Sequence, residues 1–123
     1  MKLETIAQGD SCRLEGPRNS WAIHTEQAWS VFYIKLESTS NSRPQIPGVD
    51  FSKYSILAVF MGEKNNGGYS TEITRVLQNG KNVEVYVQET SPKPGDRNGQ
   101  ALTQPYHIVK IPKADGKVEF KYL

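Results

Sequence analysis

The pattern of apolar and polar positions predicts a chain built mostly of strands. Residues 55–61, "SILAVFM", form a continuous apolar run, which is typical of a strand buried on both faces. In residues 82–88, "NVEVYVQ", valines alternate with more polar residues, as in a strand with one covered face, and residues 117–123 repeat this pattern. Residues 69–77 and 106–112 are further strand predictions, so we expect about five antiparallel strands in a meander.

One segment near the N-terminus has the period of a helix instead. Four large apolar side chains fall on one helical stripe: Trp29, Phe32, Tyr33 and Leu36. Thr25 offers a hydroxyl that caps a helix N-terminus, and the Ser/Asn cluster followed by Pro44 and Pro47 prevents continuation. The sequence therefore predicts an amphipathic helix from Glu26 to Glu37.

Turn-forming residues complete the predicted fold. Asn79-Gly80 is a hairpin signal between two of the strands, because these residue types tolerate positive φ. Residues 1–20 contain scattered Gly, Asp, Ser and Pro, and we expect loose structure there, with room for one short strand around Leu3 to Ala7. The expected fold is α+β, mainly β, with one amphipathic helix on an antiparallel sheet, in a single domain over residues 1–123.

Charge and hydropathy exclude several classes of function. The 15 basic and 13 acidic residues give a net charge of +2 and alternate along the chain, so no concentrated basic face for nucleic acid is expected. No segment approaches the roughly 20 apolar residues that a membrane span requires. We expect a soluble chain as given, either cytoplasmic, or secreted or in the cell envelope with its signal removed; the compartment stays open.

Few residues offer catalytic chemistry. Cys12 is the single cysteine, which excludes an intrachain disulfide and a thiolate metal cluster. His24 and His107 have no partner at metal-ligand spacing, and the glycines lack the offsets of a phosphate-binding loop. We therefore expect no metal, no cofactor and no enzymatic activity. A small hydrolase with an unrecognised site remains an alternative, because catalytic triads assemble in space rather than in sequence.

Two loops are candidate binding sites instead. Paired glycines let another chain approach closely, and tyrosine suits protein interfaces. The candidate binding residues come from "NNGGYS" and "QPYH": Asn66, Gly67, Gly68, Tyr69, Gln104, Pro105, Tyr106 and His107. A structural alternative exists for each loop. Tyr69 would pack on the sheet beside a lengthened turn, and Pro105 would start a strand in which His107 is a satisfied strand histidine.

Several segments in order resemble the C-terminal domain family of the protease complex subunit PrcB. They are "VDFSKYSILAVFMGEKNNGGYSTEITRV", "VEVYVQETSPKPG" and "LTQPYHIVKIP", within residues 49–112. The resemblance implies a non-catalytic accessory role that stabilises or assists a protease assembly. The matching motif positions are Gly62, Gly67, Gly68, Tyr69, Pro94, Gly95, Pro105, Tyr106 and His107.

The order of three loops is also similar to that of chagasin-like cysteine protease inhibitors. "NNGGY", "PGDRNG" and "QPY" follow one another as the inhibitor loops do, but too few residues separate the second and third, so the likeness is a functional analogy. We expect a module that binds a polypeptide, a protease being one candidate, with Tyr69 and Tyr106 as anchors. A protease inhibitor using the same loops is the alternative.

Overall fold

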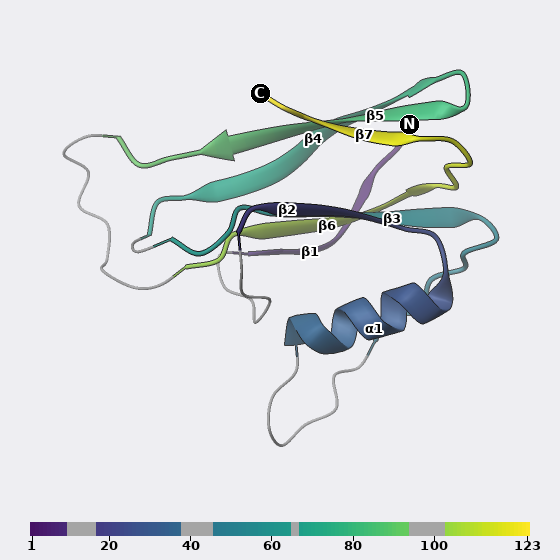
Figure 1. Cartoon of the computed structure of the whole chain (residues 1–123), viewed down its shortest axis with the longest axis horizontal. Helices are drawn as coiled ribbons and strands as arrows, with labels where there is room; N and C mark the ends of the chain where they lie inside the picture. The colour runs from purple at the N-terminus through teal and green to yellow at the C-terminus, as the bar shows by residue number, and fades with distance from the viewer. Residues whose placement is uncertain (10–16, 38–45, 65–66, 94–102) are drawn as a thin grey trace.

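The computed structural model describes residues 1–9, 17–37, 46–64, 67–93 and 103–123, and in it a helix and two sheets form three layers (Figure 1). In chain order the elements are β1 (Glu4–Gly9), β2 (Asn19–Ile23), α1 (Glu26–Glu37), β3 (Tyr54–Phe60), β4 (Ser70–Asn79), β5 (Asn82–Thr90), β6 (Tyr106–Pro112) and β7 (Val118–Tyr122). Five residues singled out from the sequence lie outside the described residues: Cys12, Pro44, Asn66, Pro94 and Gly95.

The middle layer is an antiparallel sheet with the strand order β1-β6-β3-β2. Its strand β3 is buried from Ser55 to Phe60, which confirms the prediction of a strand covered on both faces. Leu57 and Val59 face the three-stranded sheet, whereas Ile56, Ala58 and Phe60 face the helix. The continuous apolar run in the sequence reflects these two separate contacts, one on each side of the strand.

The outer sheet has the order β4-β5-β7. Its buried valines pack against the middle sheet and form one hydrophobic core with it. The β4–β5 hairpin pairs Asn79 with Asn82, and Gly80 takes a φ of 64°, which confirms the predicted turn. The predicted meander is wrong at its end, because β7 runs parallel to β5. Residues 113–117 carry the chain from one sheet to the other, so that Val118 starts beside Val83 at the beginning of β5.

The described residues near the N-terminus contain two strands, where we expected loose structure with room for one. Strand β1 confirms the short strand predicted around Leu3 to Ala7 and pairs with β6, with a bulge between Thr5 and Ala7. Strand β2 was not predicted, and it forms the opposite edge of the same sheet beside β3. The described residues therefore form seven strands in two sheets, where about five in one sheet were expected.

Helix α1 has the predicted bounds and covers the face of the middle sheet opposite the three-stranded sheet (Figure 1). The Thr25 hydroxyl accepts a hydrogen bond from the Ala28 amide at 3.2 Å, as a helix cap should. The predicted apolar stripe is buried, and the Trp29 indole donates to the Pro47 carbonyl at 2.9 Å. The α+β, mainly β class is confirmed. No helix in the described part of the chain is both long and apolar enough to cross a membrane.

Candidate functional site

The two predicted loops lie side by side at one end of the molecule, at the left in Figure 1. Lys64 and Thr103 exchange backbone hydrogen bonds, at 2.8 Å from the Lys64 amide and 2.9 Å from the Thr103 amide. The Met61 amide also donates to the Pro105 carbonyl at 3.0 Å. These bonds continue the β3–β6 pairing beyond the end of the sheet, so segments far apart in the sequence form one surface.

Two glycines in the first loop have backbone conformations that other residues rarely adopt. Gly62 has a φ of 89° and Gly68 a φ of 88°, both in the left-handed region. Gly67 is not among the glycines with positive φ. Gly62 and Gly68 are therefore needed for the backbone conformation of the loop, and a side chain at either position would strain the backbone.

The two tyrosines differ in how firmly they are packed. Tyr69 is partly exposed, and the Lys64 ammonium lies 5.2 Å from its ring centroid, within reach of a cation–π interaction. Tyr106 stacks on Phe60 with ring centroids 6.3 Å apart, and a Cβ added at Gly9 would come within 3.2 Å of its ring. Tyr106 is thus part of the packed fold, whereas Tyr69 stands at the rim of the loop.

The segment around Tyr106 contributes less surface than its sequence indicated. Gln104 is partly exposed, but Pro105 is buried, and His107 is only 1% exposed. The His107 Nδ1 accepts a hydrogen bond from the Ile73 amide at 2.9 Å, so its proton is on Nε2, which lies 2.9 Å from the Thr5 hydroxyl. Burial lowers the pKa of His107. In this conformation the ring joins β6 to β1 and β4 and offers a partner no surface.

The other histidine approaches a hydroxyl, which bears on the hydrolase alternative. The His24 Nδ1 lies 3.0 Å from the Ser55 Oγ, a contact that sequence spacing did not reveal. Ser55 is fully buried, and its Oγ also accepts a hydrogen bond from the Ala114 amide at 3.1 Å. A nucleophile needs access to its substrate and an oriented base, and no described hydrogen bond joins His24 to a carboxylate. The contact between His24 and Ser55 therefore has the features of a structural hydrogen bond rather than of a catalytic pair.

The family comparison covers the elements that carry both loops. Residues 55–112 match the family model described as PrcB C-terminal, within the 49–112 segment that carried the resemblance. The match runs from β3 to β6 and includes the hydrogen-bonded loops. Comparisons with curated proteins and with solved structures find no match. The family is one of accessory domains rather than known catalysts. The segment from Ser55 to Pro112, which forms the centre of the fold, is therefore similar to the PrcB C-terminal family.

Proposed function

We propose that this protein is a non-enzymatic binding module that stabilises or assists a protease complex. Its contact is the paired-loop surface, which we define as residues 61–64, 67–69 and 103–105. The observation that carries the proposal is the bridge between Lys64 and Thr103, because it joins two parts of the family motif into one surface. The partner is a polypeptide, and a protease subunit is the candidate that the family suggests.

The chemistry of this surface suits protein contact better than small-molecule binding. Tyr69 presents a partly exposed ring, and the bare backbone at Gly68 lets another main chain come close. Lys64 holds the Tyr69 ring from one side. Tyrosine is one of the side chains that are enriched at protein interfaces and that contribute most to binding there.

Replacement of Tyr69 tests the proposal most directly. Tyr69→Ala should lower the recovery of the partner by at least about tenfold in affinity capture from the source cells, as expected when a buried aromatic anchor is lost. The matched control is Tyr86→Ala on β5, because Tyr86 is also partly buried and has Lys121 5.9 Å from its ring centroid. Equal recovery by both variants would contradict a binding role for the paired-loop surface.

Tyr106 needs a different substitution, because its ring stacks on Phe60. Tyr106→Phe keeps the ring and removes the hydroxyl, whereas Tyr106→Ala should lower the melting temperature as well as the recovery of the partner. A loss of binding in Tyr106→Phe with unchanged melting would place the hydroxyl in the interface. Intact binding in this variant would show that the partner does not need the Tyr106 hydroxyl.

Active-site titration of proteases distinguishes the accessory role from inhibition. The purified protein should leave papain-like and serine proteases at full activity if it acts as an accessory module. Stoichiometric inhibition that Tyr69→Ala removes would instead assign the paired-loop surface to a protease inhibitor.

A further inference from the structure

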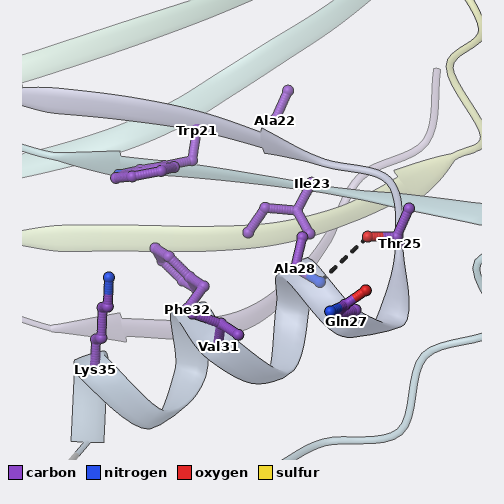
Figure 2. Close-up of a pocket in the computed structure, with 9 residues that line it drawn as sticks. All are labelled: Trp21, Ala22, Ile23, Thr25, Gln27, Ala28, Val31, Phe32 and Lys35. Carbon is purple, nitrogen blue, oxygen red and sulfur yellow. Dashed lines mark hydrogen bonds between the residues drawn. The ribbon is translucent and has the colours of Figure 1, made fainter.

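A second surface of the molecule has the features of a binding site and lies outside the family motif. It is an apolar groove of about 570 Å³ between the strand β2 and the helix α1 (Figure 2). We call it the β2–α1 groove. Its lining residues are Trp21, Ala22, Ile23, Thr25, Gln27, Ala28, Val31, Phe32 and Lys35.

Large apolar side chains are left exposed along this groove. Trp21 is 41% exposed and Val31 is 51% exposed, from opposite walls. Between them lies the ring of Phe32, whose centroid is 5.8 Å from that of Trp21 at an angle of 56°. Figure 2 shows the Trp21 ring above and Phe32 with Val31 below. Exposed apolar side chains that gather in one concave place mark a site where another apolar surface docks.

The strand that forms one wall is also the edge of its sheet. Strand β2 pairs with β3 on one side, and in the described part of the chain no strand pairs with its other side. The backbone groups on such an edge are available for hydrogen bonds with an added strand about 4.8 Å away. Because side chains of a strand alternate between faces, every second side chain of the added strand would point toward α1.

The length and charge of the groove restrict the occupant further. From Gln27 to Lys35 the helix rises about 12 Å at 1.5 Å per residue, which is the length of about four residues of extended chain. Lys35 is the single charged residue among the described residues that line the groove, and it lies at the opposite end from Thr25 and Gln27 (Figure 2). A carboxylate on the occupant would complement this cation.

We propose that the β2–α1 groove binds an extended segment of a partner protein that pairs with the free edge of β2. Its apolar side chains, at alternate positions, contact Trp21, Val31 and Phe32, and a carboxylate at one end reaches Lys35. Recognition by strand addition uses main-chain hydrogen bonds for affinity and alternate side chains for specificity. The site is separate from the paired-loop surface, so it adds a second contact to the proposed function.

A display library of random eight-residue peptides, selected on the full chain, tests this proposal. We expect enriched sequences with apolar residues at alternate positions and Asp or Glu near one end. Val31→Glu should weaken the enriched peptides by at least about tenfold, because it places a charge on the apolar wall. The control is Ile34→Glu on the same helix, since Ile34 is 48% exposed but does not line the groove. Lys35→Glu should change the preferred end residue from acidic to basic.

Methylated peptides separate strand pairing from simple apolar contact. N-methylation of alternate amides on the edge that faces β2 should abolish binding, whereas methylation on the other edge should not. Tyr69→Ala should leave peptide affinity unchanged, so this test is independent of the paired-loop surface.

Four results would overturn the proposal. They are enrichment of no peptide family, enrichment of proline-rich peptides that cannot add a strand, equal binding by Val31→Glu and the wild type, and insensitivity to N-methylation on either edge. A concentration-dependent dimer in sedimentation that Val31→Glu dissociates would instead assign the groove to a second copy of the chain.

Discussion

A single buried residue, His107, joins three strands of the fold. Its ring accepts from the Ile73 amide in the outer sheet and reaches the Thr5 hydroxyl in the middle sheet. The Pro-Tyr-His motif looked like part of a binding loop because sequence alone does not show which way a strand residue points. The third residue of that motif is inside the molecule, so at this position the motif reflects the packing of two sheets.

Substitutions at His107 should show this structural role. His107→Ala removes the acceptor of the Ile73 amide and leaves a cavity, so the free energy of unfolding should fall by about 2 to 4 kcal/mol. His107→Asn retains an acceptor near the position of Nδ1 and should lose less. Urea unfolding monitored by circular dichroism measures both values, and equal losses in the two variants would contradict the importance of the Ile73 bond.

The lowered pKa of His107 also predicts a pH dependence of stability. Below the ordinary histidine pKa of about 6.5 the unfolded chain binds a proton that the folded chain does not, so stability is full above this pH and falls below it. The loss continues until the pH reaches the lowered folded pKa and amounts to at most about 1.4 kcal/mol per pH unit. Unfolding measured from pH 7.5 to pH 5 should therefore have a smaller slope in His107→Asn than in the wild type.

At the scale of elements, strand β7 depends on a very close approach of two turns. A Cβ added at Gly116 would lie 1.8 Å from the Lys81 carbonyl oxygen, so the turn before β7 packs directly on the β4–β5 hairpin. The amide of Val83 donates to the Lys117 carbonyl at 2.8 Å beside this contact. The alternation in "KVEFKYL" predicted that this segment is a strand. It did not predict which strand it pairs with, because the parallel pairing with β5 depends on this contact between residues far apart in the sequence.

Gly116→Ala should therefore separate β7 from β5. We expect a loss of about 1 to 3 kcal/mol in the free energy of unfolding, as for other overpacked sites. Gly48→Ala is the control, because a Cβ there meets nothing within 4 Å and should leave stability unchanged or raise it by up to about 1 kcal/mol. Faster hydrogen exchange of the Leu123 amide, which donates to the Val87 carbonyl, would locate the loss at β7.

Elements with a strong local signal were predicted well, and those held by long-range contacts were not. Helix α1 combines a cap at Thr25 with a full apolar stripe, so its bounds could be read from the sequence. Strand β2 is only five residues long, and its Trp21 stays 41% exposed, so it shows no alternation that marks a buried face. The groove beside β2 was missed for the same reason.

For the whole molecule, strand β1 links the first residues to the last third of the chain. It pairs Glu4 with Lys110, and its Thr5 supplies one partner of His107. Deletion of residues 1–8 should therefore lower the melting temperature and expose the edge of β6 to aggregation. Thermal unfolding with light scattering measures both effects, and an unchanged melting temperature would show that β1 is dispensable.

The pairing of β1 with β6 also has a consequence for synthesis on the ribosome. At about 5 to 20 residues per second, roughly 5 to 20 s pass between translation of Glu4 and translation of Lys110. During this interval β1 has no partner strand, because β6, which lies between β1 and β3 in the middle sheet, has not yet been made. The nascent chain must therefore keep strand β1 unpaired until β6 has left the ribosome, which gives chaperones at the tunnel exit a defined segment to protect.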